Sequence, residues 1–561
     1  MTGCGNRPSP EAAAREACEH QATPVEHPSN TGRTRVEHGR APEPGAACHA
    51  ELVHVRSPSL AWRGLFAGAA AALLLAGCAA DARTPSAAAR AQRTSTTSAP
   101  TTTTTSTLPV TPIAWTPCNG DLQCGTLTVP LDYATPQGTT IGIALERHLA
   151  EDPAERIGSL VINPGGPGVS GIDDFPNELS ALTSQLLDDF DIVTFDPRGV
   201  ERSDPVTCGE TPGAPPAPVS DPVPQTVAAQ KAAIAAMRQF GADCQKASGA
   251  ILPFVGTVDV ARDLERLRIA LGDATLTYMG QSYGTLLGAT YAEMFPTHVR
   301  AMVLDSAIDP ALPIGQFTLG QAKGFEGALS SFFTWCAAST SCPWQTTDDP
   351  TAAILGLIAR SRTGPAPAGS GRTAGPGEMY NALLEGLYAE SDWPTLGTAL
   401  ADDAEGNGAP IVTMSDRYLA DGSTNGSDAG EAIDCLDHPV SRDVSGYATL
   451  AAQYGVVAPV FGPFLAWGQA ACAVWPVAAT RTPAPAAAVG SPPILVVGTT
   501  GDPATPYAWA VSLARQLSQG DLLSRDGNDH VAYFYSGCVR SYVQTYLVGG
   551  GAPAPGTICP S

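Results

Sequence analysis

The stretch TYMGQSYGTLLGATYAEMF, from Thr277 to Phe295, decides how this sequence is interpreted. An apolar segment leads into Gly-Gln-Ser-Tyr-Gly, and a helix-like run follows. The five-residue pattern is weak evidence alone, because glycine makes up 58 of the 561 residues. Between a strand and a helix, however, it is typical of a nucleophile elbow, in which the glycines permit a strained turn. The setting therefore predicts that Ser282 is a catalytic nucleophile.

The segments around this stretch alternate between strand and helix patterns. One segment, VDVARDLERLRIALGD, has its apolar residues at helical spacing. Strand, helix and strand in succession predict an α/β fold, with a mostly parallel sheet that carries helices on both faces. The short apolar runs that indicate strands lie within GSLVINPGGPGVSG, FDIVTFDPRGV, LTYMGQSYG and RAMVLDSAID.

The pattern changes after Pro310, where helical segments broken by Pro and Gly replace the alternation. Strand-like sequence returns only at SPPILVVGTTGDPATPY. The chain is therefore expected to fold as a core interrupted by a helical cap. The predicted boundaries are 115–310 for the first part of the core, 311–485 for the cap and 486–561 for the rest of the core.

Residues 56–78 have the pattern of an export signal. The run from Leu65 to Gly77 is uncharged and follows two arginines. Its 13 residues are too few to span a bilayer, which takes about 20, but they fit the apolar region of a signal peptide. The run ends in LAGC, which resembles a bacterial lipobox and predicts lipid attachment at Cys78.

Two further amino-terminal segments are not expected to form domains. Residues 79–114 are rich in Thr, Ser and Pro, bury little apolar surface and predict a disordered tether. Residues 1–55 are polar and lack periodicity, and they belong to no recognisable signal peptide. We interpret them as a mis-assigned or disordered extension, with the natural start near Val53 or Val55.

Charge and cysteine content narrow the class of protein. A net charge of −23 argues against nucleic acid as a partner, since phosphate binding needs clustered Lys and Arg. An even number of cysteines after an export signal indicates disulfide bonds, and none has the spacing of a zinc site, so no metal is expected. Pairing sequence neighbours is the simplest arrangement of the ten: Cys118, Cys124, Cys208, Cys244, Cys336, Cys342, Cys435, Cys472, Cys538 and Cys559.

A serine hydroxyl needs a base before it becomes a strong nucleophile. His530, in GNDHVAY, follows the last strand-like segment, where this architecture places its base. The other histidines after Cys78 lie in an early strand, at a helix-to-strand junction and in the predicted cap: His148, His298 and His438.

The acid that orients the imidazole is expected after a late strand. Asp502, in GTTGDPATPY, has that position, with Asp305 and Asp529 as its rivals. The oxyanion donors are expected to be the N–H of Tyr283 and an N–H from the NPGGPGVSG loop, for which we favour Gly166 and then Gly165. The DPRG segment at 196–199 is expected to shape the same sheet edge.

At this point the sequence resembles the actinobacterial secreted tripeptidyl aminopeptidases, α/β-hydrolases related to proline iminopeptidase. The resemblance implies the α/β-hydrolase fold, a triad of Ser282, Asp502 and His530, and release of short peptides from free amino termini. Two residues depart from the pattern: Glu201 replaces a common Gly, and Asp529 stands before the histidine where a Gly is expected. The motifs are CGTLTVPLDY, NPGGPGVSG, FDPRGV, GQSYGTLLGATYAEMFP, AIDCLDHP, CAVWP, GTTGDPATPY and SGCVRSYVQTYLVGGGAPAPGTIC.

An aminopeptidase must also bind the ammonium group of its substrate, usually through carboxylates in the cap. Asp434 and Asp437, on either side of Cys435, are candidates, as is Glu385. Glu390 and Asp392, in the same segment as Glu385, are further ones.

The sequence thus predicts an exported serine hydrolase that acts on peptides through an acyl-enzyme, without metal or cofactor. It predicts an extracytoplasmic location and membrane contact only through a lipid anchor; the oligomeric state stays open. Relatives of the family include lipid esterases, so an esterase or lipase with the same triad is one alternative. A non-catalytic binding lipoprotein on a hydrolase scaffold is the other.

Overall fold

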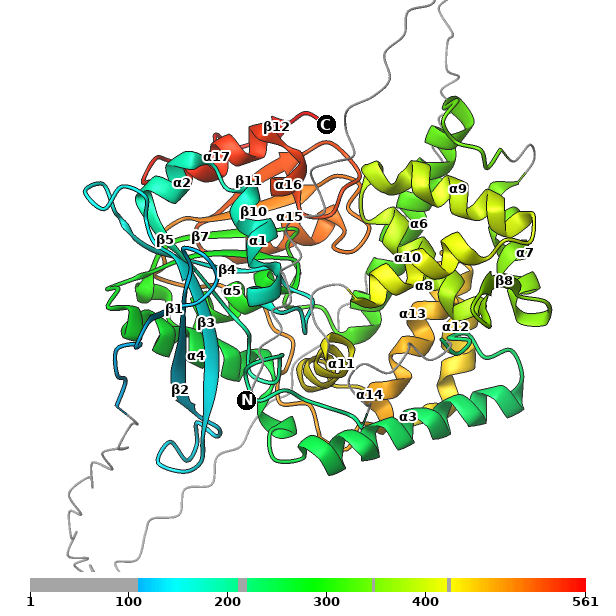
Figure 1. The fold of residues 1–561 in the computed structure, drawn as a ribbon, viewed down its shortest axis with the longest axis horizontal. Coiled ribbons are helices and arrows are strands. Elements are labelled where there is room, and N and C mark those ends of the chain that lie inside the picture. Colours follow the sequence, from blue (N-terminus) through cyan, green and yellow to red (C-terminus); the bar gives the residue numbers. More distant parts are fainter. Residues whose placement is uncertain (1–108, 210–218, 346–348, 421–424) are drawn as a thin grey trace, which may run out of the picture. The chain divides into compact units, whose positions relative to one another are not determined.

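The computed structural model describes residues 109–209, 219–345, 349–420 and 425–561 (Figure 1). The predicted extension, the signal peptide with Cys78 and most of the tether lie outside these residues. Within them, no helix is both long enough and apolar enough to cross a membrane.

Ten strands form the main sheet, and most of them run parallel. Their order is β1-β2-β3-β5-β4-β6-β7-β10-β11-β12. Neighbours from β1 to β5 pair antiparallel and all later pairs are parallel, which confirms the predicted sheet. The strands are β1 (Thr116–Pro117), β2 (Gln123–Pro130), β3 (Thr140–His148), β4 (Gly158–Asn163), β5 (Phe190–Phe195), β6 (Leu276–Gln281), β7 (Val299–Asp305), β10 (Ile494–Thr499), β11 (Gly520–Arg525) and β12 (Ile558–Cys559).

Helices cover both faces of this sheet, so its central strands are buried on both sides and read as continuous apolar runs. Successive residues of β6 enter opposite cores, Tyr278 on one face and Met279 on the other. The helices on the Tyr278 face are α4 (Thr257–Leu271), α5 (Tyr283–Met294) and α15 (Tyr507–Gln516). Those on the Met279 face are α1 (Gly171–Ala181), α2 (Ser184–Asp189), α16 (Ala532–Tyr535) and α17 (Gly537–Leu547).

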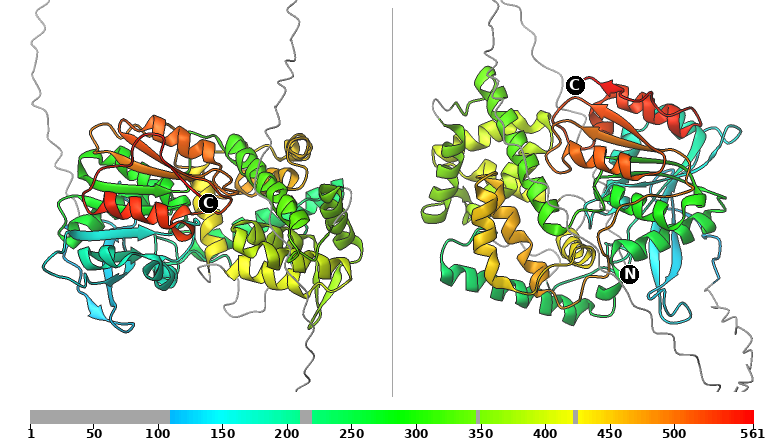
Figure 2. Two further views of the ribbon diagram at one scale, coloured as in Figure 1. Left: turned by 90° about the horizontal axis from the view of Figure 1, so that it is seen from above. Right: turned by 180° about the vertical axis from the view of Figure 1, so that it is seen from behind.

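The segment predicted as a cap is helical and has a hydrophobic core of its own beside the sheet (Figures 1 and 2). It also contains a short hairpin, β8 (Ala366–Gly369) with β9 (Arg372–Ala374). Its helices are α6 (Ile314–Ala338), α7 (Pro350–Thr363), α8 (Pro376–Leu387), η4 (Glu390–Asp392), α9 (Trp393–Ala404), α10 (Ala409–Ala420), α11 (Gly426–Asp437), η5 (Val444–Gly446), α12 (Tyr447–Gly455), α13 (Phe461–Gly468) and α14 (Ala470–Val474).

Two helices pack into a different hydrophobic core from the one that their position in the sequence suggests. α3 (Val227–Ser248), before the predicted cap, packs along α14 and places Ile234 in the core of the cap (Figure 1). α11, inside the predicted cap, instead places Ala432, Ile433 and Leu436 in the core of the sheet. Both differences arise because side-chain packing, not chain order, decides which core a helix joins. Two short 3-10 turns, η2 (Leu252–Phe254) and η3 (Pro296–His298), complete the fold.

All ten cysteines after Cys78 are paired with their sequence neighbours, as expected. The bridges are Cys118–Cys124, Cys208–Cys244, Cys336–Cys342, Cys435–Cys472 and Cys538–Cys559.

The arginine of the DPRG segment is fully buried and binds several segments of the chain. Arg198 is 0% exposed, and its guanidinium binds both carboxylate oxygens of Asp263 at 2.6 Å. Its remaining N–H groups donate to the carbonyls of Pro130, Leu131 and Phe254. The segment therefore joins β2, α4 and the loop after β5.

We predict that Arg198→Met destabilises the fold, because it leaves the Asp263 carboxylate buried without its cation. The expected loss is about 3–5 kcal/mol in the free energy of unfolding, measured by urea titration. Arg262→Ala is the control: this arginine pairs with Asp259 but is 39% exposed, so its loss should cost at most about 1 kcal/mol. Equal effects of the two variants would contradict this interpretation.

Candidate active site

Ser282 lies in a strained turn between β6 and α5. Its backbone has φ 51° and ψ −122°, angles that residues with a Cβ rarely adopt. The glycines of the motif are needed for space: a Cβ on Gly284 would lie 2.6 Å from the carbonyl oxygen of Asn163, and one on Gly280 would overlap the carbonyl of Gly284. The local geometry is that of a nucleophile elbow.

His530 and Asp502 form the second part of the site. The imidazole Nδ1 lies 2.9 and 3.0 Å from the two carboxylate oxygens of Asp502. The carboxylate also accepts hydrogen bonds from the N–H groups of Ala504 and Thr505 and from the Thr505 hydroxyl. An acceptor at Nδ1 fixes the proton there, so Nε2 is left as the basic nitrogen.

The end of β7 joins the elbow to the histidine. The carbonyl oxygen of Asp305 accepts from the N–H of Ser282 at 3.0 Å. The buried carboxylate of Asp305 accepts from the N–H groups of Ala532 and Tyr533, two and three residues after His530. Burial raises the pKa of Asp305 to about 6. Asp305, the rival acid, therefore joins the elbow to the segment after His530. None of these hydrogen bonds involves the imidazole.

Ser306, the next residue, adds a second link. Its hydroxyl donates to Asp502 at 2.6 Å and accepts from the N–H of Val531 at 2.7 Å. The acid and the residue after His530 are thus held by one side chain. Ser282, Asp502 and His530 come from three separate segments, and Asp305 and Ser306 connect all three.

The other rival acid, Asp529, faces away from this pair. One of its oxygens binds Arg525 at 2.6 Å, and the other accepts from the N–H of Glu390 in the cap at 2.7 Å. The N–H of His530 donates to the carbonyl of Tyr388, also in the cap, at 2.8 Å. The cap therefore holds the loop that carries the histidine.

The loop after β4, here called the oxyanion loop (residues 164–170), lies against the elbow. A Cβ on Gly165 would come within 2.6 Å of the carbonyl oxygen of Gln281 and 3.0 Å of Ser282 Cβ and Tyr283 N. Gly165 and Gly166 have φ of 107° and 100°, which favours glycine. The structure thus brings Gly165 against Ser282 and the nitrogen of Tyr283, and Gly166, the donor that the sequence favours, is the next residue of this loop.

The remaining histidines have other surroundings. His148 lies 3.7 Å from Asp121, and His298 lies 3.0 Å from Glu265. His438 is buried against Phe317, and burial lowers its pKa to about 4.

Most of the acids proposed for ammonium binding already have protein partners. Asp437 is 1% exposed and accepts from both the N–H and the hydroxyl of Thr257. Glu385 and Asp392 both pair with Arg417. Glu390 accepts from the Asn528 amide at 2.7 Å.

Asp434 differs from these acids. Its side chain is 51% exposed and lies 4.0 Å from the imidazole of His438. Glu431, one turn earlier on α11, was missed in the sequence, although its spacing places it on the same helix face. Burial raises the pKa of Glu431 to about 7. Partial burial and the charges of Glu431 and Asp437 raise the pKa of Asp434 well above its usual value.

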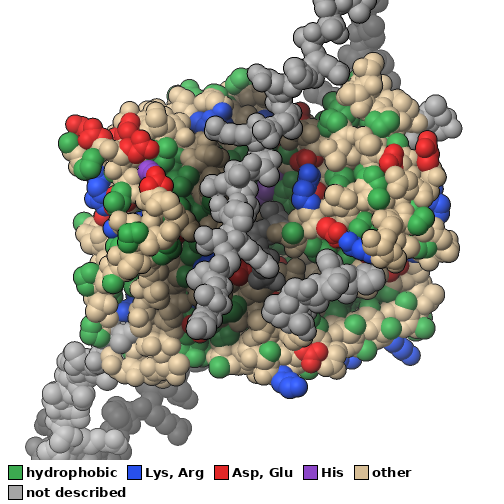
Figure 3. Space-filling model, viewed as in Figure 1, with side chains coloured by type: hydrophobic (Ala, Val, Ile, Leu, Met, Phe, Trp, Pro, Cys, Tyr) green, Lys and Arg blue, Asp and Glu red, His purple; other side chains and the backbone are tan. Residues whose placement is uncertain are grey.

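α11, which carries these two acids, lies between the core and the rest of the cap (Figure 1), and the face seen in Figure 3 is hollowed along that junction. Among the described residues, two groups of side chains are close enough together to resemble metal ligands. Each of these groups contains a disulfide, Cys118–Cys124 or Cys435–Cys472, whose sulfurs are already bonded to one another.

Comparison with known proteins gives two family matches. A model described as alpha/beta hydrolase fold matches residues 158–355, and one described as TAP-like protein matches residues 458–559. Most of the cap lies between the two.

Three relatives extend over most of the chain. Serine protease Hip1 of Mycobacterium tuberculosis is 36% identical over 481 residues, covering 80% of this chain and 91% of that protein. Tripeptidyl aminopeptidase of Streptomyces coelicolor is 33% identical, covering 80% and 86%. Carboxylesterase B of Mycobacterium tuberculosis is 36% identical, covering 78% and 86%. The expected resemblance is confirmed.

A buried acid that contacts Gln281 of the elbow makes the stability of the fold depend on pH. Glu178 is 1% exposed and accepts from the Gln281 side chain at 3.1 Å. Burial, with the charge of Asp174, raises its pKa to about 8. The native state therefore holds a proton that the unfolded chain releases above its ordinary pKa of 4.5. This contribution to stability is complete below that value and is lost as the pH rises through about 8.

We predict that Glu178→Gln, which needs no such proton, gains stability relative to wild type between pH 5 and pH 8. The gain should reach at most about 1.4 kcal/mol per pH unit, measured by denaturant titration at each pH. Glu405→Gln, at an exposed position, is the control and should follow the wild-type curve. Parallel curves for Glu178→Gln and wild type would refute the prediction.

Proposed function

Because the chain belongs to the α/β-hydrolase family that includes tripeptidyl aminopeptidase and serine protease Hip1, we propose that it is an exported serine exopeptidase that releases short peptides from free amino termini. The observation that carries the proposal is the elbow at Ser282, which Asp305 and Ser306 link to a buried Asp502–His530 pair. The TAP-like match over the carboxy-terminal part supports it.

In the proposed mechanism the Ser282 oxygen attacks the substrate carbonyl while Nε2 of His530 takes the hydroxyl proton. Asp502 keeps the Nδ1 proton in place and stabilises the imidazolium. The N–H groups of Tyr283 and Gly166 bind the oxyanion of the tetrahedral intermediate. Collapse of the intermediate breaks the peptide bond, and the imidazolium protonates the leaving amine. Water, activated by the same imidazole, then hydrolyses the acyl-enzyme.

For the free amino terminus of the substrate we propose Asp434, assisted by Glu431. Burial raises the pKa of both carboxyls, and repulsion from Glu431 and Asp437 raises that of Asp434 further. A bound ammonium group would relieve that repulsion and favour the ionised forms. Asp437 and Glu385 are not part of this proposal, since Thr257 and Arg417 occupy their carboxylates.

Export and anchoring form part of the proposal. The five disulfides fit an oxidising, extracytoplasmic location. We propose lipid attachment at Cys78, with residues 79–114 as the tether of the hydrolase. Peptides are the proposed partners, and nucleic acid is not.

An esterase is the second candidate, favoured by the 36% identity to a protein named carboxylesterase B. A panel of chromogenic tripeptides with free or blocked amino termini, together with acyl esters, separates the two. The proposed exopeptidase cleaves the free peptides far faster than the blocked ones, and Ser282→Ala abolishes both activities. Rapid cleavage of esters without cleavage of free peptides would favour the esterase, and a folded protein without a fluorophosphonate adduct at Ser282 would favour a binding protein.

We predict that Asp434→Asn raises KM for free-amino peptides about ten- to hundredfold, the worth of one charge-assisted hydrogen bond. Hydrolysis of an amino-blocked peptide or an ester should keep its wild-type constants, because neither carries the ammonium group. Steady-state kinetics on these matched substrates measure the effect. A uniform loss on all substrates would point to a structural role for Asp434 instead.

A further inference from the structure

The amino-terminal turns of α11 touch the oxyanion loop backbone to backbone. A Cβ on Gly168 would overlap the carbonyl oxygen of Gly426 and lie 2.8 Å from the nitrogen of Gly430. A Cβ on Gly430 would in turn lie 2.9 Å from the carbonyl oxygen of Pro167. Gly168 and Gly430 thus let the helix lie directly against the loop that carries the Gly166 peptide.

The carboxy-terminal end of the same helix is connected through Thr257 to Tyr283, which carries the other proposed donor. The Asp437 carboxylate accepts from the N–H of Thr257 at 3.0 Å and also from its hydroxyl. That hydroxyl lies 2.6 Å from the phenol oxygen of Tyr283. All three side chains are buried, so the chain of contacts from α11 to Tyr283 is shielded from water.

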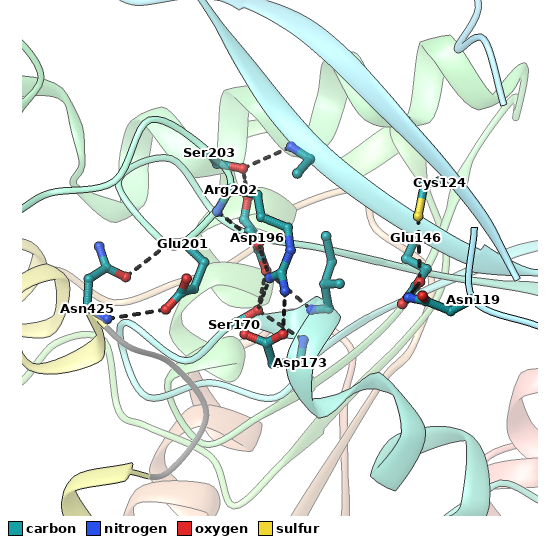
Figure 4. A network of polar contacts seen from close by, with 12 residues as sticks. Asn119, Cys124, Glu146, Ser170, Asp173, Asp196, Glu201, Arg202, Ser203 and Asn425 are labelled. Atoms are coloured by element: carbon teal, nitrogen blue, oxygen red, sulfur yellow. Dashed lines mark hydrogen bonds and ion pairs between the residues drawn. The ribbon is translucent and has the colours of Figure 1, made fainter. Parts of the chain in front are cut away.

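α11 is also fixed to the sheet independently of the rest of the cap. Asn425, at its amino terminus, donates its side-chain amide to the carbonyls of Gly199 and Val206 at 2.9 Å. Asn425 and Glu201 also exchange two hydrogen bonds, each from the backbone N–H of one residue to the side chain of the other (Figure 4). Glu201 has φ 39°, a conformation that favours glycine, and its side chain binds the helix.

Further contacts restrain the remainder of this helix. Asp428 accepts from the N–H of Cys208 at 2.7 Å. The disulfide Cys435–Cys472 links it to α14. Its apolar face lies in the core of the sheet. The helix is therefore attached along its whole length, and its two ends reach the loop of one proposed donor and the side chain of the other.

We propose that α11 is the positioning element of the oxyanion hole, and that Gly430 and Asp437 set the placement of the Gly166 and Tyr283 amides. This inference rests on the proposed function, because it assigns a role within the same site. Neither residue touches the substrate; each acts through the donor that it supports. A displacement of either donor weakens binding of the developing oxyanion and leaves binding of the ground-state substrate unchanged.

The test is Gly430→Ala, with Gly327→Ala as its matched control. Both positions are inside cap helices, where alanine favours the helix over glycine. A Cβ at Gly430 meets the backbone of the oxyanion loop, whereas a Cβ at Gly327 meets nothing within 4 Å. Gly430→Ala should lower kcat about ten- to hundredfold, up to the effect of losing one oxyanion donor, with KM unchanged. Gly327→Ala should retain the wild-type kcat.

Affinity for a peptide boronic acid, whose adduct with serine places an oxygen in the oxyanion hole, should fall in parallel with kcat/KM. General destabilisation of the fold would not produce this pattern. If Gly430→Ala does not fold, Thr257→Val removes the hydroxyl that joins Asp437 to Tyr283 and should give the same signature. Thr257→Ser retains the hydroxyl and should restore activity.

The rate of fluorophosphonate labelling at Ser282 separates the possible failures. If wild type is labelled and both the Gly430 and the Thr257→Val variants match it in kcat and boronate affinity, the inference is overturned and the proposed function stands. If wild type forms no adduct, the proposed function fails and the inference fails with it. Selective loss of kcat and boronate affinity, with rescue by Thr257→Ser, supports the inference.

Discussion

Backbone segments approach one another around Ser282 more closely than any side chain would allow. The elbow touches Asn163 through Gly284, the oxyanion loop touches the elbow through Gly165, and α11 touches the loop through Gly168 and Gly430. Each contact needs bare backbone on at least one side. The glycines therefore do more than permit unusual dihedral angles. They allow three polypeptide segments to stack behind the nucleophile, and the positions of their N–H groups follow from that stacking.

This stacking matters because the surroundings of the site are acidic. Glu178, Asp305 and Asp437 are all buried, and burial raises the pKa of each. Ionised carboxylates near Ser282 would oppose the negative charge of an oxyanion. The raised pKa values reduce that opposition, and hydrogen bonds from backbone N–H groups hold the carboxylates that remain charged. Fixed amide donors are then the main source of stabilisation for the oxyanion, so their placement must be rigid. The same acidity favours a cationic substrate terminus.

The local sequence pattern was sufficient to predict the features that lie within one segment of the chain. The strand, turn and helix around Ser282 are visible in the sequence, as are the positions of Asp502 and His530 after late strands and the disulfides between neighbouring cysteines. The features that were missed arise from contacts between distant segments. Nothing near Asp437 in the sequence indicates that its carboxylate will bind Thr257. Nothing near Glu201 indicates that it will exchange hydrogen bonds with Asn425. α11 likewise has the amphipathic pattern of any cap helix, which does not specify the core that its apolar face will join.

The contacts of the cap argue against treating it as a separate lid. α6 lies against the loop of Asp502, since a Cβ on Gly324 would overlap the carbonyl of Pro503. The segment between α8 and η4 binds the histidine loop through Tyr388 and Glu390, and α11 lies against the oxyanion loop. A rigid swing of the cap would break the first two supports at once, and α11, which is fixed to the sheet, could not move with it. The cap is therefore better understood as one wall of the catalytic site. If that wall stays in place during turnover, a fixed acidic helix beside the nucleophile can select substrates by the distance between their ammonium group and the scissile bond, without any closing movement.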